Sequence, residues 1–322
     1  MSLKNFLVLS NIILLVMLSG CKSPEHQEVI SNQEPSAYSL SGQPLYSIQH
    51  SEETMIKRDS LLEVARVNYE EDPTNLHNII WYGRRLAYVD RHDEAIATYT
   101  LGMESHPEAP ELFRHRGHRF ITTRNVDNAI EDFITAAELA EDREIEIEPD
   151  GLPNALNIPL SNLQFNIYYH LGLAYFLKGE YTLAEVAYLE CMKYSVNPDL
   201  KVATSDWLYM TYMAQGKSDD ALKVIEAIPD DIEIIENDGY LRRIKMYKGE
   251  ILPTELVDLN AEGGDRLGLV TQGYGVAHYY KTTGDKENYI KILNQILELE
   301  YWSAFGFISA EYDKYRMDQV RN

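Results

Sequence analysis

A pattern of small and aromatic residues recurs at a spacing of 34 residues in the first half of this chain. The residues that repeat are Gly83 and Gly117, Ala95 and Ala129, and Tyr99 and Phe133. A period of this length is typical of units built from two antiparallel helices, which bury their apolar faces only by stacking on neighbouring units. The chain is therefore predicted to fold as an all-α solenoid.

The length and the charge of the chain limit its domain organisation and the classes of partner that it can bind. Its 322 residues would suffice for two ordinary domains, but a stacked array uses the same length as one body. The net charge of -22 argues against nucleic acid or bare anionic lipid as the main partner, because lysine and arginine bind phosphates. With only two cysteines, the sequence predicts no disulfide framework.

The N-terminal region has the layout of a secretory signal peptide, predicted over residues 1–20. Lys4 precedes an apolar run from Phe6 to Leu18 that is too short for a membrane span. The last residues, Leu18-Ser19-Gly20-Cys21, resemble a bacterial lipobox. This resemblance implies that Cys21 becomes the first residue of a lipoprotein and carries acyl chains such as palmitate. An uncleaved anchor, or an ordinary signal peptide with an incidental cysteine, is the alternative.

The expected location follows from this modification. Two or more acyl chains hold a protein stably on a bilayer. Lys22 stands where an aspartate would retain many lipoproteins in the inner membrane, so the protein is expected in the bacterial cell envelope, at the outer membrane. Residues 21–51 are predicted to be a tether that is partly extended. Its apolar spots, Tyr38 to Leu40 and Leu45 to Ile48, would alternatively lie along the solenoid as a cap.

The predicted solenoid occupies residues 52–322. A helix at 52–71 would cover the first repeat, and an insertion at 144–164 interrupts the period. The repeats lie near 76–109, 110–143, 165–198 and 202–235, followed by degenerate pairs to 300 and a capping helix at 302–315.

The repeats resemble the tetratricopeptide repeat family. The third unit, for example, carries Tyr168, Leu171, Gly172, Tyr175, Ala184 and Tyr188 at the family positions. The resemblance implies antiparallel helix pairs in a right-handed superhelix. A looser similarity over the whole chain, in stretches such as 83–88, 114–119 and 304–306, is to uncharacterised bacterial lipoproteins of this family, and it implies no activity.

In this family, the first helix of each pair lines a concave surface. The residues that the resemblance places there are Trp81, Arg84, Tyr88, Arg114, His115, His118, Tyr169 and His170. Such a groove is basic and aromatic in an acidic protein, so it suits a partner protein or an acidic peptide. The alternative is that the arginines only form ion pairs with nearby acidic residues.

The insertion at 144–164 is predicted to fold across this groove, because segments that break a repeat often emerge on the binding face. Asp150 or Asn154 would then contact the ligand or the arginines. A simple spacer is an equal alternative.

The histidines raise the question of a metal site or an enzyme. His115, His118 and His170 would suffice for zinc, but neighbouring arginines repel a dication, so no metal or other cofactor is predicted. No catalytic motif occurs, which removes the positive case for an enzyme. The alternative function is a periplasmic small-anion-binding protein or enzyme that uses these side chains under a lid formed by 144–164. Cys191 is interpreted as a packed thiol.

Overall fold

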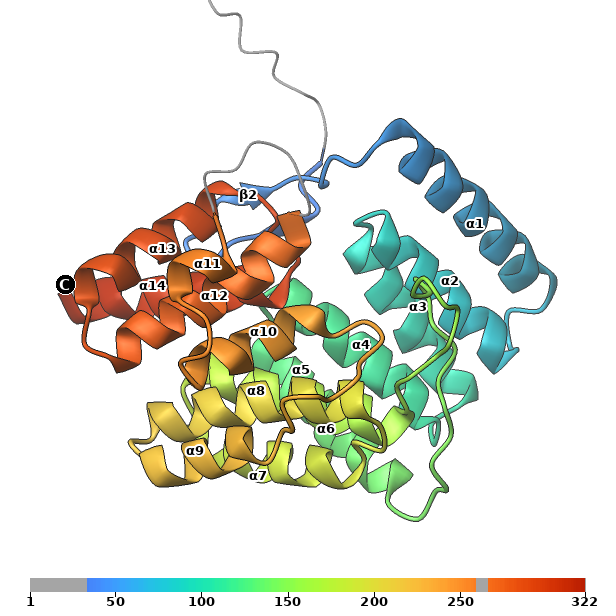
Figure 1. The fold of residues 1–322 in the computed structure, drawn as a ribbon. Helices are drawn as coiled ribbons and strands as arrows, with labels where there is room; N and C mark the ends of the chain where they lie inside the picture. The colour runs from blue at the N-terminus through green and yellow to red at the C-terminus, as the bar shows by residue number, and fades with distance from the viewer. Residues whose placement is uncertain (1–33, 259–265, 322) are drawn as a thin grey trace, which may run out of the picture. The chain divides into compact units, whose positions relative to one another are not determined.

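The computed structural model describes residues 34–258 and 266–321. The predicted signal peptide and Cys21 lie outside the described residues. The described part of the chain is all-α apart from one two-stranded ribbon of β1 (Ala37–Tyr38) and β2 (Pro44–Leu45) (Figure 1). None of its helices combines the length and the apolar composition needed to cross a bilayer.

The helices follow one another as antiparallel pairs, and most pack mainly against their neighbours in the sequence, whereas α10 packs mainly on α8 and α12. They are α1 (Glu52–Glu71), α2 (Leu76–Tyr88), α3 (His92–Ser105), α4 (Pro110–Thr122), α5 (Val126–Ala140), α6 (Leu163–Lys178), α7 (Tyr181–Lys193), α8 (Pro198–Ala214), α9 (Ser218–Glu226), α10 (Asp238–Tyr247), α11 (Pro253–Leu256), α12 (Arg266–Thr282), α13 (Lys286–Glu298) and α14 (Phe305–Arg321). The predicted all-α array of antiparallel helix pairs is confirmed.

The repeated glycines place the two helices of each pair in close contact. A Cβ atom on Gly83 of α2 would lie 2.4 Å from the ring of Tyr99 in α3. The same hypothetical atom on Gly172 of α6 would lie 2.7 Å from the ring of Tyr188 in α7. Only a hydrogen atom fits between each helix and the facing ring, which explains why glycine and an aromatic residue recur together.

The fourth pair, α8 and α9, has no glycine at this position and packs through different residues. Tyr209 of α8 stands at the glycine position, and its ring stacks on Tyr247 of α10 with centroids 4.2 Å apart. The facing helix α9 carries the smaller Ile225, which is fully buried. A large residue on one helix is thus balanced by a smaller one on the other.

The C-terminal helices return to the beginning of the array. The guanidinium of Arg124, in the turn between α4 and α5, lies 2.8 Å from the Glu311 carboxylate of α14 and donates to the carbonyl of Trp302 at 2.9 Å. The predicted capping helix at 302–315 is observed as α14, which starts later and also contacts α6. It therefore lies against an earlier repeat.

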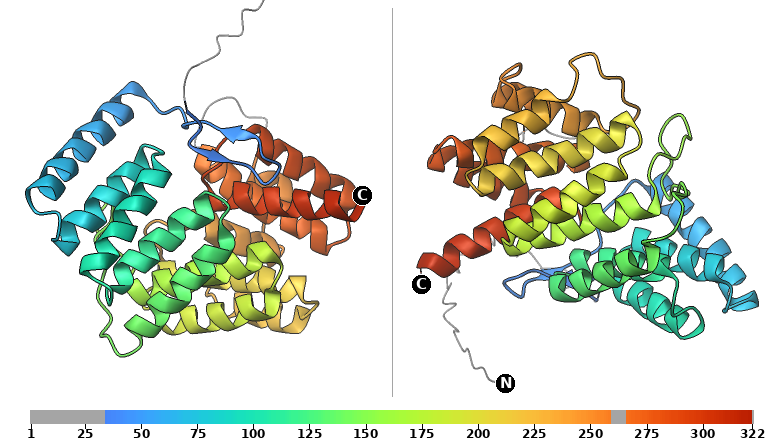
Figure 2. Two further views of the ribbon diagram at one scale, coloured as in Figure 1. Left: turned by 180° about the vertical axis from the view of Figure 1, so that it is seen from behind. Right: turned by 90° about the horizontal axis from the view of Figure 1, so that it is seen from below.

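The segment that precedes α1 is held by these C-terminal helices. The backbone N–H of Leu40 donates to Glu311 at 2.7 Å, and the Trp302 indole donates to the Tyr46 carbonyl at 2.6 Å. Figure 2 shows the two strands beside the C-terminal helices. Ile48 is buried. Residues 34–50, part of the predicted tether, thus pack on the helical array.

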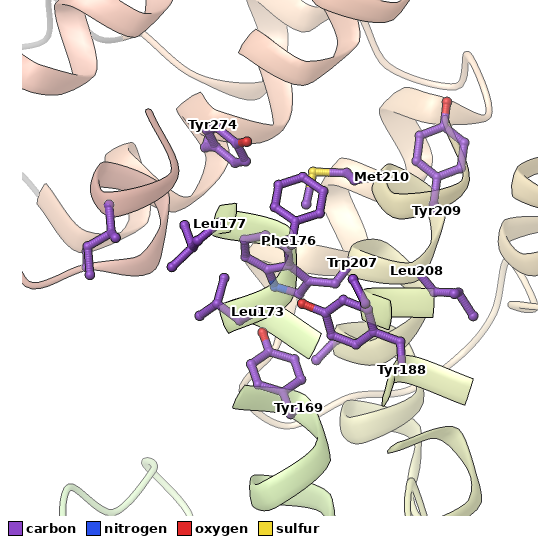
Figure 3. Packing of buried hydrophobic residues seen from close by; sticks show 14 of the residues in the cluster. Tyr169, Leu173, Phe176, Leu177, Tyr188, Trp207, Leu208, Tyr209, Met210 and Tyr274 are labelled. Carbon is purple, nitrogen blue, oxygen red and sulfur yellow. The ribbon is translucent and has the colours of Figure 1, made fainter. Parts of the chain in front are cut away.

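An aromatic core joins the middle of the array to α12 (Figure 3). The ring of Phe176 meets Trp207 edge to face at 5.4 Å, and Trp207 stacks near Tyr274 at 6.2 Å. A buried ion pair between Asp206 and Arg243, 2.8 Å apart, lies beside this cluster. The core fixes the relative positions of α6, α8, α10 and α12.

Candidate functional site

The structure brings the predicted arginine and histidine residues of α4 and α6 together. The Arg114 guanidinium contacts the His115 ring, with Nη1 and Nδ1 2.8 Å apart. His118 lies against His170 of the next repeat, with ring centroids 4.4 Å apart. Equivalent faces of neighbouring first helices therefore converge, as the repeat geometry predicts.

These side chains lie in a low-dielectric environment. Burial lowers the pKa of His115 and His118 well below 6.5, and the nearby arginines lower it further. Burial also lowers the pKa of His170 to about 3. The His170 ring donates from Nδ1 to the Asn166 carbonyl, because a carbonyl only accepts. All three histidines are neutral at pH 7, so arginines supply the positive charge here.

The insertion between α5 and α6 lies on the arginines of α2 and α4. The Arg114 guanidinium forms an ion pair with Glu148 at 2.9 Å. Arg84 donates to the Pro149 carbonyl at 2.9 Å, and Arg85 donates to the Gly151 carbonyl at 3.0 Å. Arginine side chains from two repeats thus hold one short acidic stretch of the same chain.

The two insertion residues singled out in the sequence have different positions. Asp150 lies near Arg84, which opposes the rise in pKa that burial causes in this carboxyl group. Its Oδ2 atom is buried and has no hydrogen-bond partner among the described residues. Asn154 lies away from the arginines, since its amide donates to the Ile158 carbonyl at 2.7 Å and to Glu236 at 3.1 Å.

The histidine end of the predicted groove is covered by the start of α14. The Phe305 ring, at the start of α14, lies 5.3 Å from the His118 ring and 5.4 Å from the His170 ring. Tyr169 is buried, and its hydroxyl donates to that of Tyr240 at 3.0 Å. The reason is the return of the C-terminal helices onto the inner face of α4 and α6.

The other end of the predicted groove is open. A cleft of about 210 Å³ lies between α1 and α2, and Trp81 and Arg85 form one wall of it. We call it the Trp81 cleft, lined by Leu61, Val64, Ala65, Asn68, His77, Asn78, Trp81 and Arg85. The guanidinium carbons of Arg84 and Arg85 lie 4.6 and 4.8 Å from the Trp81 ring centroid.

A second hollow contains residues that the sequence prediction missed. A pocket of about 280 Å³ is lined by Tyr88 and His118, which were predicted, and by Arg58 and Arg119, which were not. Arg119 directly follows His118, so the basic run 114–119 was a usable signal. Arg58 carried no such signal, because it lies on the helix before the first repeat. Separately, no group of three or more His, Cys, Asp or Glu residues suited to a metal ion occurs in 34–258 and 266–321.

One repeat of this chain matches a known family. Residues 165–195 match the family model of the tetratricopeptide repeat. No curated protein matches the chain.

Several solved structures are similar to this chain. That of MamA has 17% sequence identity and a TM-score of 0.42, and the match covers 63% of this chain and 100% of that chain. The structure of YrrB, described as a TPR protein with an unusual peptide-binding site, has 14% identity and a TM-score of 0.42, over 74% and 93% of the two chains. The APC/C hetero-tetramer Cut9-Hcn1 has 14% identity and a TM-score of 0.46, over 76% and 37%. The match at 165–195 falls on α6 and α7, so this helix pair is similar to a tetratricopeptide repeat and lies within an array of antiparallel helix pairs.

Proposed function

We propose that this protein is an interaction module that holds an acidic, partly apolar segment of a partner protein in the Trp81 cleft. Tetratricopeptide repeats are scaffolds for binding other proteins, which supports a protein partner. One observation carries the choice of site: an open cleft places a tryptophan ring, the Arg85 guanidinium and an apolar wall next to one another, and the Arg84 guanidinium also lies against the tryptophan ring.

The chemistry of the cleft selects the partner segment. A guanidinium that stacks on an indole ring presents N–H groups at its edge, where they bind a carboxylate. One N–H group of Arg84 and one of Arg85 already donate to the insertion, so the remaining ones would bind the partner. Arg84 and Arg85 are both half-buried and lie next to Trp81. Leu61 and Val64 of α1 offer an apolar wall opposite them. In a suitable partner segment, an acidic residue binds the arginines and a neighbouring aliphatic or aromatic residue packs on the apolar wall.

The insertion supports this interpretation, because it binds the same row of arginines. Glu148 pairs with Arg114, and the carbonyl of Gly151 accepts from Arg85, which also lines the cleft. The inner part of the row is therefore already occupied by an acidic stretch of the chain itself. At Trp81, the N–H groups of Arg84 and Arg85 that do not bind the insertion remain for a partner. Since the protein carries a net charge of -22, its other surfaces repel an acidic segment and so favour this cleft.

The proposal includes the location of the module. We infer that acyl chains on Cys21 tether it to the bacterial outer membrane, and that the lipobox-like Leu18-Ser19-Gly20-Cys21 directs this modification. The expected result is that Cys21→Ser releases the protein into the soluble fraction. Membrane association of the unacylated variant would refute the lipid anchor. It would not bear on the proposal that the Trp81 cleft binds a partner.

The binding proposal is tested by affinity capture from detergent-solubilised membranes of the source cells. Wild type is compared with Trp81→Ala and with Leu222→Ala, which alters an exposed apolar residue on α9. We expect a partner that wild type and Leu222→Ala retain and that Trp81→Ala loses. Capture of the same set of proteins by all three forms would show that the cleft is not the binding site.

A further inference from the structure

A pocket beside the covered histidines, which we call the Arg119 pocket, has the walls of a binding site. It has a volume of about 280 Å³, and its walls come from parts of the chain that are far apart in sequence. Residues of α1, α2 and α4 form one side. The lining is completed by Ile48, His50, Asp90, His92, Leu152, Leu267, Tyr301, Ser303, Ala304 and Phe305. It is separate from the Trp81 cleft.

Arg119 is the central feature of this pocket. Its side chain forms no hydrogen bond or ion pair with any residue in 34–258 and 266–321. Burial lowers the pKa of Arg119, but arginine starts so high that it keeps its charge at neutral pH. The Arg119 side chain is half-buried, so its guanidinium is partly shielded from water and has no acceptor among the described residues. An anion in the pocket would supply that acceptor.

The remaining groups on the walls set the charge of the ligand. Arg58 is the second cation; it donates to the Tyr88 carbonyl at 2.7 Å, while its buried Nε has no partner among the described residues. Asp90 is the acidic residue of the lining, and its Oδ2 accepts from the Ile48 N–H at 2.8 Å. Burial lowers the pKa of His50, His92 and His118, so these rings are neutral at pH 7.

Among the described residues of the lining, two cations and one carboxylate leave an excess of one positive charge. A monoanion neutralises it, whereas a dianion such as a phosphate monoester meets repulsion from Asp90. The planar guanidinium of Arg119 matches a carboxylate in a bidentate manner. His118, whose ring has no hydrogen-bond partner among the described residues, adds one N–H donor or acceptor.

The apolar walls and the volume of the pocket limit the size and polarity of the rest of the ligand. Leu152, Leu267 and Phe305 supply apolar side chains to the lining. A volume of about 280 Å³ corresponds to roughly nine water molecules, so a short branched or ring-shaped body fits and an extended peptide does not. We propose that the Arg119 pocket binds a monocarboxylate with a small apolar body, either a free small acid or the C-terminal carboxylate of a chain that ends in an aliphatic residue.

Calorimetric titration of the full-length protein in detergent tests this proposal with defined probes. The probes are isovalerate, its neutral amide, inorganic phosphate, and the peptide acetyl-Gly-Val-Leu with a free or an amidated C-terminus. We expect binding of isovalerate or of the free-acid peptide, and at least roughly tenfold weaker binding of the corresponding amide and of phosphate. Binding of isovalerate identifies a free acid as the source, and binding of the free-acid peptide alone identifies a chain terminus.

Variants separate binding from folding. Arg119→Gln should weaken binding of that carboxylate by roughly tenfold or more. Its melting temperature should stay close to that of wild type, since the Arg119 side chain forms no hydrogen bond or ion pair with a described residue. Arg66→Gln, which alters an exposed arginine on α1, should bind like wild type. Trp81→Ala should also bind like wild type, so the two sites are tested independently. Equal binding of acid and amide, no binding of any probe, or full binding by Arg119→Gln would overturn the proposal.

Discussion

The carboxylate of Glu148 lies 2.9 Å from the guanidinium of Arg114, although the two residues belong to different structural elements. Glu148 is in the insertion, and Arg114 is on the inner face of α4. This pair joins the segment that interrupts the repeats to the surface that the repeats form. It also occupies an arginine that a partner would otherwise contact.

Removing the charge of Glu148 should destabilise the protein. Glu148→Gln leaves Arg114 buried without a counter-ion, and breaking such a pair costs about 3 kcal/mol where both side chains retain slight exposure. Urea unfolding followed by circular dichroism measures the change. The matched control is Glu111→Gln, whose pair with Arg143 is more exposed, and its cost should stay below about 1 kcal/mol. Similar losses in both variants would show that the insertion is not held by this pair.

Gly151 should tolerate no side chain. A Cβ atom there would lie 1.8 Å from the Tyr88 hydroxyl oxygen, so Gly151→Ala forces the insertion away from α2. Hydrogen exchange should become faster over 144–162, and urea unfolding should show a loss of more than about 1 kcal/mol.

Two further variants make the Gly151 measurement specific. In a Tyr88→Ala background the cost of Gly151→Ala should fall by roughly 1 kcal/mol, because the clashing ring is absent. Gly239→Ala is the control, since the nearest atom to a Cβ there is 3.9 Å away and alanine favours helix α10. Additive effects of Gly151→Ala and Tyr88→Ala would contradict the close approach.

Acid should destabilise the fold through the buried histidines. Burial lowers the pKa of His170 to about 3, while an unfolded histidine has a pKa near 6.5. Between these two pH values the unfolded chain binds more protons, so stability falls as pH falls, by up to about 1.4 kcal/mol per pH unit for this histidine. Above pH 6.5 it adds no pH dependence. His170→Asn should flatten the curve of unfolding free energy measured at pH 7.5, 6.0 and 5.0, and an unchanged slope would refute this assignment.

The thiol of Cys191 should be unreactive in the folded protein. Burial raises its pKa to about 12, and its Sγ lies 3.4 Å from the hydroxyl of Thr204. In the Cys21→Ser variant, a disulfide reagent such as DTNB should react at pH 8 only as fast as the protein unfolds. Urea should accelerate the reaction in parallel with the loss of helical signal. Rapid labelling without denaturant would show that the thiol is accessible.

The sequence predicted the parts of this fold that depend on contacts between neighbouring elements. Gly83 and Tyr99 reveal their contact because both recur one repeat later, as Gly117 and Phe133. The convergence of His118 and His170 followed from the same regularity. These contacts are repeated along the chain, so the period itself encodes them.

Contacts outside the period could not be predicted in this way. Phe305 covers His118, and Arg124 binds Glu311, but no repeated spacing links either pair. The insertion was expected across the arginines, yet Arg85 is bound by a backbone carbonyl of Gly151, and any residue has a carbonyl. Residue type alone therefore does not indicate which part of the insertion reaches the arginines.

Site-specific photocrosslinking at the Trp81 cleft tests the central claim most directly. His77 is exposed at the cleft, so a photoreactive amino acid in its place should crosslink the partner in intact cells. The same amino acid in place of Leu222 on α9 serves as the control. We predict a crosslinked partner at position 77 that is absent at position 222 and is lost when Trp81→Ala is added. Crosslinking at position 222 alone, or crosslinking at position 77 that survives Trp81→Ala, would contradict the account.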